Sequence, residues 1–493
     1  MRHDDGVNAA FARIVVLVSG AAILVVETLA VRLVAPYVGL TLESTTAVIG
    51  VALAGIAAGA ALGGRWADDL PPRAVAAGAL AVGGLGVLAV RPLVRLFGPV
   101  FGPGPLAAVL LVAMSTLLSV TALAMVTPAV TRARLSGLDG SGTVVGSLSA
   151  AGTIGSLAGT FLTGFVLVAL LPIAAILVGT GAACLVLALL TATTRTRAAT
   201  TATGVTAAAL VVALVAVPGR CDADTTYYCA SVQPDPRRPS ARVLVLDDLR
   251  HSYVDLADPT HLEFSYTRRF AAAIDTAFPG PAPVSAVHVG GGGFTMPRWL
   301  AATRPGSTST VLEVDAGVVE LGRRELGVDP IEGLDIRLGD ARTTLARLPD
   351  GSADLVVGDA FGARSVPWHL ATVEFADEVQ RVLRPGGIYV VNVIDNHPMR
   401  LLAAETATLA QRFPHVVLLA APAQLARGGG GNTVLVASDA PIDTATLAAR
   451  VAERGETGTV LDQAATRRFA TGAPVLTDGR APVDQLLTPF RSA

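Results

Sequence analysis

The chain has 493 residues, of which 52% are hydrophobic and only 15% are charged, and its net charge is −2. Soluble proteins carry about 25% charged residues. The deficit here is concentrated in the first half, which indicates two domains of different solvent class. The near-neutral charge provides no basic surface, so no nucleic-acid partner is expected.

The N-terminal half is predicted to be a multi-span α-helical membrane domain. A span needs about 20 mostly apolar residues. Seven such segments follow one another, at residues 13–36, 45–66, 74–92, 105–128, 142–170, 172–192 and 201–217. Glycine and alanine recur within them at spacings of three and four, which allows close helix contact in lipid. We therefore expect a transmembrane domain over residues 1–217, with the lipid bilayer as its partner.

Glu27 is the one acid within a predicted span, and Arg32 follows it on the same segment. An intramembrane carboxylate is a functional hypothesis by default. A structural ion pair between the two side chains explains the pattern equally well, so both interpretations stay open.

The orientation of the chain in the membrane is predicted by two opposing arguments. The arginine distribution puts the N-terminus in the cytoplasm, and seven spans then put the soluble domain outside. Cys221 and Cys229 agree with this if they form a disulfide, which requires an oxidising compartment; two unrelated thiols are the alternative. A nucleoside cofactor made in the cytoplasm argues for the opposite side, as does a count of six spans. We favour an extracytoplasmic soluble domain on a bacterial cell membrane.

The second half is predicted to be a soluble α/β domain. Residues 218–285 contain a linker, a small β-element and a first helix. Over residues 286–493, strands at 286–289, 309–314, 335–338, 354–358 and 388–394 alternate with helices at 296–304, 316–326, 341–348 and 370–383. This alternation is typical of a doubly wound, Rossmann-like parallel sheet. Residues 440–493 are predicted to be a small helical tail.

Polar residues gather where the predicted strands end, which is where doubly wound sheets bind ligands. A glycine bend, Gly290 to Gly292, follows the first strand, and Glu313, Asp340 and Asp359 end the next ones. An acid at the end of the second strand can accept both ribose hydroxyls. These residues predict a nucleoside site; for Glu313 and Asp340 the alternative is a strand-end turn or a helix N-cap. No histidine pair has metal-ligand spacing, so no metal is expected.

Together these residues resemble the S-adenosylmethionine-dependent transferase fold of the class I methyltransferase type, and within it the spermidine synthase family. The resemblance covers about residues 225–395. It is carried by Leu244-Val-Leu-Asp-Asp248, Glu263-Phe-Ser-Tyr266, Gly290-Gly-Gly292, Leu312-Glu-Val-Asp315, Gly339-Asp-Ala341, Asp354-Leu-Val-Val-Gly-Asp359 and Leu383-Arg-Pro-Gly-Gly387. The N-terminal half also looks like the membrane half that is fused to such domains in bacterial membrane proteins.

The resemblance implies a role for each matching residue. Glu313 would hold the ribose hydroxyls, Asp340 the adenine amine, and Gly290, Gly291, Gly292 and His251 would line the cofactor. Asp359 would accept a proton from the attacking amine, and Tyr266 would contact that amine. The implied cofactor, consumed as a substrate, is decarboxylated S-adenosylmethionine or S-adenosylmethionine itself.

The chain departs from the family motif at two acids. Gly293 stands where the motif has an aspartate after the three glycines, and Gly362 replaces a second active-site acid. Three hypotheses follow: an aminopropyltransferase acting on a small amine, a methyltransferase on the same fold, or a non-catalytic nucleoside- or polyamine-binding domain coupled to a transporting or signalling membrane domain. A homo-oligomer is compatible with each.

Overall fold

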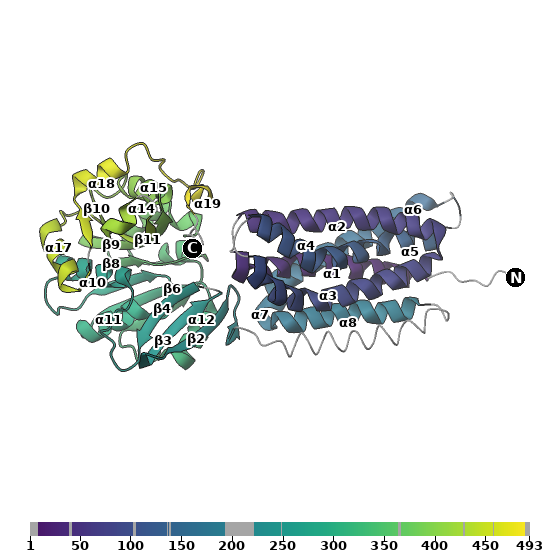
Figure 1. The fold of residues 1–493 in the computed structure, drawn as a ribbon, viewed down its shortest axis with the longest axis horizontal. Helices are drawn as coiled ribbons and strands as arrows, with labels where there is room; N and C mark the ends of the chain where they lie inside the picture. The colour runs from purple at the N-terminus through teal and green to yellow at the C-terminus, as the bar shows by residue number, and fades with distance from the viewer. Residues whose placement is uncertain are drawn as a thin grey trace. The chain divides into compact units, whose positions relative to one another are not determined.

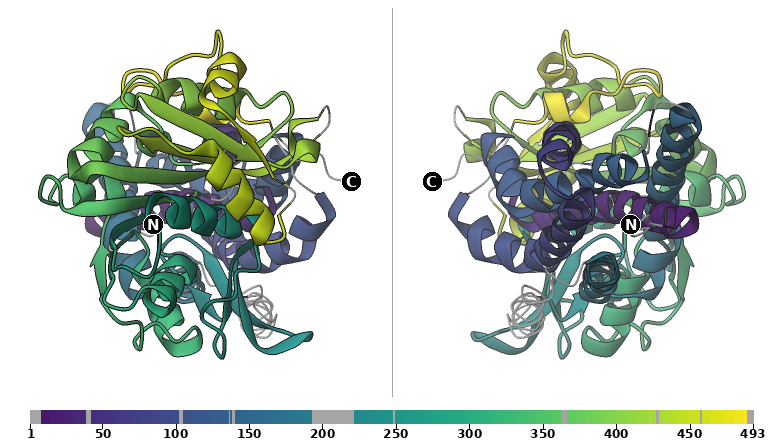
Figure 2. Two further views of the ribbon diagram at one scale, coloured as in Figure 1. Left: turned by 90° about the vertical axis from the view of Figure 1, so that its left-hand side faces the viewer. Right: turned by 90° about the vertical axis from the view of Figure 1, so that its right-hand side faces the viewer.

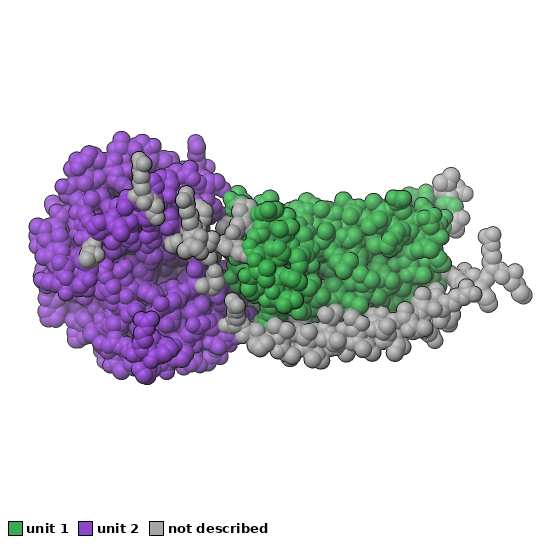
Figure 3. All heavy atoms as spheres, viewed as in Figure 1, with its two compact units in different colours: residues 1–220 green, residues 221–493 purple. Residues whose placement is uncertain are grey.

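The chain forms two compact units, residues 1–220 and 221–493 (Figure 3). The structure is a computed structural model that describes residues 8–38, 42–101, 105–135, 137, 140–192, 221–247, 249–362, 366–426, 429–456 and 458–488. Each unit buries its own clusters of apolar side chains.

The N-terminal unit consists of apolar helices (Figure 1). They are α1 (Ala9–Val38), α2 (Leu42–Asp69), α3 (Pro72–Phe101), α4 (Pro105–Ala124), α5 (Val126–Arg134), α6 (Ser141–Leu162), a π-helical turn (Thr163–Leu167), α7 (Val168–Leu170) and α8 (Ile173–Thr191). Within the described residues, six helical segments are long and apolar enough to cross a membrane. They correspond to the first six predicted spans and confirm a multi-span helical region. The seventh predicted span, 201–217, lies outside the described residues.

Glycines bring neighbouring helices of this unit into backbone contact. A Cβ atom added to Gly155 of α6 would lie 2.0 Å from the backbone oxygen of Leu17 in α1, and one added to Gly159 would lie 2.5 Å from that of Ala21. Such an approach is possible only without side chains, and it is a common way for helices to associate in lipid. Glu27 lies half-buried in α1, and its role stays a prediction.

The C-terminal unit begins with the small β-element that the sequence predicts. Its strands are β1 (Ala223–Asp224), β2 (Cys229–Asp235), β3 (Arg238–Leu246) and β4 (Leu249–Asp255). They pair antiparallel in chain order.

The main sheet has eight strands in the order β12-β10-β11-β9-β8-β5-β6-β7. The strands are β5 (Ser285–Val289), β6 (Thr308–Glu313), β7 (Leu334–Leu338), β8 (Ala353–Gly358), β9 (Leu383–Asn396), β10 (His415–Ala420), β11 (Gly430–Ser438) and β12 (Thr459–Leu461). Strands β5 to β9 pair parallel, as predicted. The other three pair antiparallel, so the sheet is mixed.

Helices cover both faces of this sheet. They are α10 (Ser265–Ala277), α11 (Thr295–Thr303), α12 (Ala316–Glu325), α13 (Ala341–Leu345), α14 (Val373–Val382), α15 (Arg400–Leu409), α16 (Pro422–Leu425), α17 (Thr444–Glu453), α18 (Gln463–Phe469) and α19 (Val483–Leu486), with a 3₁₀ turn at Trp368–Leu370. In the left view of Figure 2, the teal α10 and the yellow α17 lie side by side on one face.

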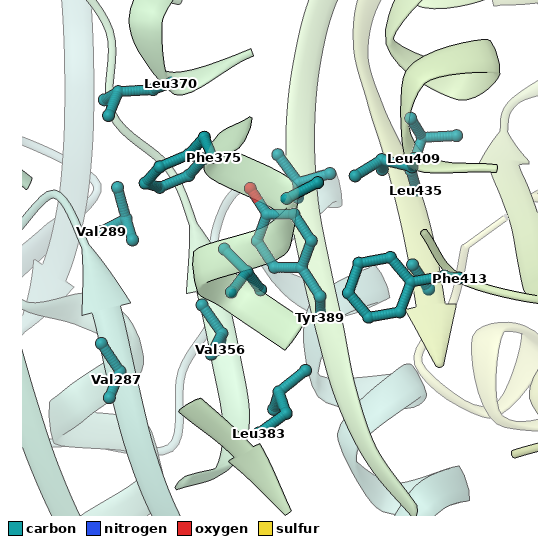
Figure 4. Close-up of a cluster of buried hydrophobic side chains, with 14 of the residues drawn as sticks. Val287, Val289, Val356, Leu370, Phe375, Leu383, Tyr389, Leu409, Phe413 and Leu435 are labelled. Atoms are coloured by element: carbon teal, nitrogen blue, oxygen red, sulfur yellow. The ribbon is translucent and has the colours of Figure 1, made fainter. Parts of the chain in front are cut away.

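Strand alternation divides the core into two layers. Val287 and Val289 of β5 pack with Tyr389 and Phe375 on the face covered by α13 to α15 (Figure 4). Ala286, which directly precedes Val287, belongs to the layer beneath α10 and α11. Because successive side chains of a strand point to opposite faces, a strand buried on both sides reads as a continuous apolar run. This explains why the parallel strands were readily predicted.

The prediction of a purely helical tail over residues 440–493 is wrong. Residues 459–461 form β12, which pairs antiparallel with β10. Three residues are too few to show a period of two, and the strand forms because β10 supplies a hydrogen-bonding edge. Strands β10 and β11 were likewise not assigned from the sequence.

Candidate functional site

A cavity of about 420 Å³ opens beside the carboxyl end of β5 in the C-terminal unit. Its walls come from β4, α10, α11, β8 and β9, together with the bend that follows β5. Of the residues predicted for the site, His251, Tyr266, Gly290, Gly291, Gly292 and Asp359 line this cavity. Glu313 and Asp340 do not belong to the lining.

The carboxylate of Asp359 is the polar centre of the cavity wall. Tyr266 Oη donates a hydrogen bond to Asp359 Oδ2 at 2.9 Å, and Asn392 Nδ2 donates one to Oδ1 at 2.9 Å. Three elements therefore meet here: Asp359 follows β8, Tyr266 lies on α10, and Asn392 lies in β9. Each carboxylate oxygen keeps a further lone pair that a ligand can use.

Burial shifts the acidity of this group. It raises the pKa of Asp359 to about 6, although the hydrogen bonds from Asn392 and Tyr266 act in the opposite direction. Burial and the neighbouring Asp359 charge also hold the pKa of Tyr266 well above its usual value. At neutral pH, Tyr266 is therefore a donor and Asp359 a carboxylate that can take up a proton near pH 6.

Asn392 is a functional candidate that sequence reasoning missed. It is 3% exposed, and its Oδ1 is a buried acceptor without a hydrogen-bond partner among the described residues. A buried polar atom of this kind costs free energy unless something bonds to it. The available signal was a single amide within the apolar run Tyr389-Val-Val-Asn-Val-Ile394.

The glycine bend is required by the close approach of two strand ends. Gly290 has φ +95°, and a Cβ atom there would lie 2.6 Å from the backbone oxygen of Asp359. Any other residue would separate β5 from β8 and displace Asp359.

Glu313 lies at the end of β6, against the glycine bend. Its Oε2 accepts from the backbone N–H of Gly291 at 2.8 Å, and its Oε1 accepts from that of Asp315 at 2.9 Å. Burial raises the pKa of Glu313, while these backbone hydrogen bonds lower it. The carboxylate is thus fixed beside the bend at the predicted strand end; its contact with a ribose stays a prediction.

Asp340 has the helix-capping geometry that was the alternative to a ligand role. Its Oδ1 accepts from the backbone N–H of Arg342 at 2.8 Å at the start of α13, and its Oδ2 lies 2.8 Å from His369 Nε2. The side chain is 42% exposed. It is accessible to a ligand, and adenine binding by Asp340 stays a prediction.

Two histidine rings, His251 and His288, line the cavity. His251 lines the cavity and its ring centre lies 6.1 Å from that of Tyr228. His288, in β5, lies 3.1 Å from Ser309 Oγ through Nε2, and burial lowers its pKa to about 3. His288 therefore adds no positive charge near Asp359.

Ser252 of β4 occupies the space beside Gly293. Its Oγ accepts from the Gly293 N–H at 2.9 Å, and a Cβ atom at Gly293 would lie 2.6 Å from Ser252 Cβ. An aspartate at position 293 would therefore displace β4. Sequence reasoning identified the missing acid but not the serine that fills its place, because the two residues are 41 positions apart.

Cys221 and Cys229 form a disulfide, so the two are not unrelated thiols. With Asp224 they are also the one cluster among the described residues whose donor atoms are close enough to share a metal ion. The disulfide withdraws both sulfurs from that role, because metal ligation by cysteine needs a thiolate.

Fold and site together define the class of this protein. The C-terminal unit is a Rossmann-like domain of the methyltransferase type with a leading β-element, and the N-terminal unit is a set of apolar helices. A family model described as a methyltransferase domain matches residues 287–391.

More particularly, the chain resembles spermidine synthases, as its motifs predict. It is 30% identical over 135 residues to a polyamine aminopropyltransferase of Vibrio vulnificus, covering 27% of this chain and 44% of that protein. It is 26% identical over 142 residues to a polyamine aminopropyltransferase of Chromobacterium violaceum, covering 29% of this chain and 53% of that protein. The chain thus spans about half the length of these relatives.

A solved structure supports the same comparison. The C-terminal unit is similar to a probable spermidine synthase from Corynebacterium glutamicum, with a TM-score of 0.50 and 29% identity. The match covers 53% of this chain and 97% of that one. The predicted fold class, apolar helices followed by a spermidine synthase-like domain, is confirmed.

Proposed function

We propose that this protein is a membrane-bound aminopropyltransferase, which uses decarboxylated S-adenosylmethionine and an amine acceptor. The observation that carries this proposal is the Asp359 carboxylate, which faces a cavity and is held by Tyr266 and Asn392. Similarity to polyamine aminopropyltransferases supports it.

The nucleoside would bind across the carboxyl ends of β5, β6 and β7. Gly290 to Gly292 would allow it to approach the backbone, Glu313 would accept the ribose hydroxyls, and Asp340 would accept from the adenine amine. The match to the methyltransferase domain model supports a cofactor of the S-adenosylmethionine type.

The reaction requires an uncharged amine nitrogen. Its lone pair forms a bond to the carbon beside the sulfonium, the carbon–sulfur bond breaks, and sulfur keeps the electron pair, which leaves a neutral thioether nucleoside. The new ammonium then loses a proton to Asp359. The free Oδ1 of Asn392 and the Tyr266 oxygen would orient the nitrogen by accepting its N–H groups, which leaves the nitrogen lone pair available for the attack.

The charges of the lining restrict the acceptor. Among the described residues that line the cavity, Asp359 is the one carboxylate and Arg250 the one guanidinium. A diamine brings a second ammonium, and the described lining residues include no second acid to pair with its charge. A monoamine fits this lining better.

A methyltransferase is the alternative, and the pair Gly293 and Ser252 favours it. The family's acid at this position would repel the carboxylate of ordinary S-adenosylmethionine. Here Ser252 fills the space without adding charge. Both reactions would use the same Asp359 environment and differ in the group transferred.

The test is a transfer assay with the full-length protein in detergent. Each cofactor is offered with monoamines and diamines, and the products are identified by mass. We expect a mass increase of one aminopropyl group. A mass increase of one methyl group would support the methyltransferase alternative. No product with either cofactor would leave the non-catalytic binding domain as the remaining hypothesis.

Asp359→Asn should reduce turnover by about 10²- to 10⁴-fold, the usual contribution of a positioned base, while nucleoside affinity is kept. Asp329→Asn is the matched control, because the Asp329 side chain is 72% exposed. If Asp359→Asn turns over like this control, the role assigned to Asp359 is wrong.

We also propose that the six apolar helices, together with the seventh span predicted from the sequence at residues 201–217, cross the bacterial membrane and that the C-terminal unit is extracytoplasmic. The Cys221–Cys229 disulfide supports this side, since disulfides persist in oxidising compartments. The arginine distribution of the sequence supports it as well.

A further inference from the structure

Tyr228 lies near two of the strand ends at which the proposed nucleoside would bind. Its Oη donates to the backbone oxygen of Phe361, after β8, at 2.7 Å. Burial and the charge of Glu313, at the end of β6, both raise the pKa of Tyr228. Strand β5, which leads into the glycine bend, lies between β6 and β8 in the sheet.

The backbone of Tyr228 is anchored beside the same crevice. Its N–H donates to Thr225 Oγ1 at 2.9 Å, and Thr225 Oγ1 donates to the carboxylate of Asp315. The N–H of Tyr227 donates to Asp315 Oδ2 at 3.1 Å. Asp315 caps α12 directly after β6, and the Cys221–Cys229 disulfide closes the hairpin. Tyr228 is thus fixed both at its backbone and at its hydroxyl group.

This arrangement divides the predicted site in two. Asp359 and Tyr266 line the open cavity, whereas Glu313 does not. The Glu313 carboxylate has spare lone pairs for two hydroxyls, so its backbone hydrogen bonds do not prevent ribose binding. Tyr228 is bonded to Phe361 after β8 and feels the charge of Glu313 at the end of β6, so it lies near both strand ends that flank the bend.

We propose that Tyr228 is a gate that sets the affinity of the site for nucleosides: its side chain must leave Phe361 before a sugar reaches Glu313. The inference depends on the proposed function, since it takes the ligand to be an adenosine thioether or sulfonium. When binding requires a minor open state, the apparent dissociation constant increases as that state becomes rarer. Weakening the hydrogen bond from Tyr228 to Phe361 should therefore increase the affinity for the nucleoside.

The experiment is calorimetric titration of the full-length protein in detergent with 5′-methylthioadenosine, which lacks the tail that distinguishes the two cofactors. Tyr228→Phe keeps the ring and removes the hydrogen bond to Phe361. A hydrogen bond of this kind changes an equilibrium constant by about 2- to 12-fold, so we expect affinity to increase by that factor. Tyr228→Ala, which also removes the ring, should bind more tightly than wild type.

Tyr227→Phe is the control, because Tyr227 is 46% exposed and its anchoring contact is made by the backbone. Unchanged or weaker nucleoside binding by Tyr228→Phe and Tyr228→Ala would contradict the proposed gate. Tyr228 would then be a fixed residue of the site.

The two proposals fail in different ways. If wild type binds the nucleoside and transfers a group, but the Tyr228 variants bind no better, only the gate is wrong. If Tyr228→Ala binds and wild type does not, the gate is supported. If neither binds, the gate and the proposed function are both wrong.

Discussion

Asp359 is the residue on which the proposed chemistry depends, and its carboxylate is held by Tyr266 and Asn392. An acid that ends a buried parallel strand must lie at the ligand-binding edge, and Asp359 does line a cavity there. Its partner Asn392 could not be assigned in the same way, because it lies within β9 and bonds across 33 positions. Tyr228 and Ser252 were missed for a related reason: the small β-element brings them to the site by tertiary packing alone.

The raised pKa of Asp359 predicts a pH dependence of transfer. The group accepts a proton only when ionised, and its ionised fraction increases with pH through about 6. We expect kcat/KM to increase through this pH and then to continue increasing as the amine substrate loses its own proton.

The Asp359→Asn variant separates these two ionisations. The residual kcat/KM of this variant should no longer increase near pH 6, because the base is absent, but should still increase at alkaline pH as the amine substrate loses its proton. The measurement is a pH profile of kcat/KM from about pH 4.5 to about pH 9.5. An unchanged acid limb in the variant would show that another group is responsible.

At the scale of elements, the parallel strands were predicted better than the antiparallel ones. Strands β5 to β9 are separated by helices, and their local patterns define them: the inner strands contain apolar runs, and the edge strand β7 alternates apolar and charged residues. Strand β12 has only three residues and depends on β10 for its hydrogen bonds. Strand β11 pairs with β9, and the paired residues Asn396 and Gly430 are 34 positions apart. A pairing over this distance in the sequence cannot be predicted from a local hydrophobic period.

The contact between α1 and α6 predicts a position-specific sensitivity. Gly155→Ala puts a methyl group 2.0 Å from the Leu17 backbone oxygen, and overpacking of this kind costs about 1–3 kcal/mol. We expect a lower melting temperature in detergent, measured by the loss of monodisperse protein after heating.

Gly146→Ala is the matched control on the same helix, because a Cβ atom at Gly146 meets nothing within 4 Å. Equal melting temperatures for the two variants would contradict the helix contact described for α1 and α6.

At the scale of the whole molecule, the side of the membrane determines which compartment supplies the nucleoside and amine. The extracytoplasmic proposal predicts that a C-terminal alkaline phosphatase fusion is active in a bacterial host and that a C-terminal green fluorescent protein fusion exported by the same route is dark. The reverse result would place the C-terminal unit in the cytoplasm. The Cys221–Cys229 disulfide would then have to persist in a reducing compartment.

The central claim is that an adenosine moiety binds at the glycine bend with its sugar on Glu313. The most direct measurement compares 5′-methylthioadenosine affinity in wild type, Glu313→Gln and the control Glu320→Gln, whose glutamate is exposed on α12, the helix that follows β6. Hydrogen bonds to a charged group contribute about 1.5–3 kcal/mol. Glu313→Gln should therefore weaken binding roughly 10- to 150-fold, and Glu320→Gln should bind like wild type. Equal affinity in all three proteins would contradict the account.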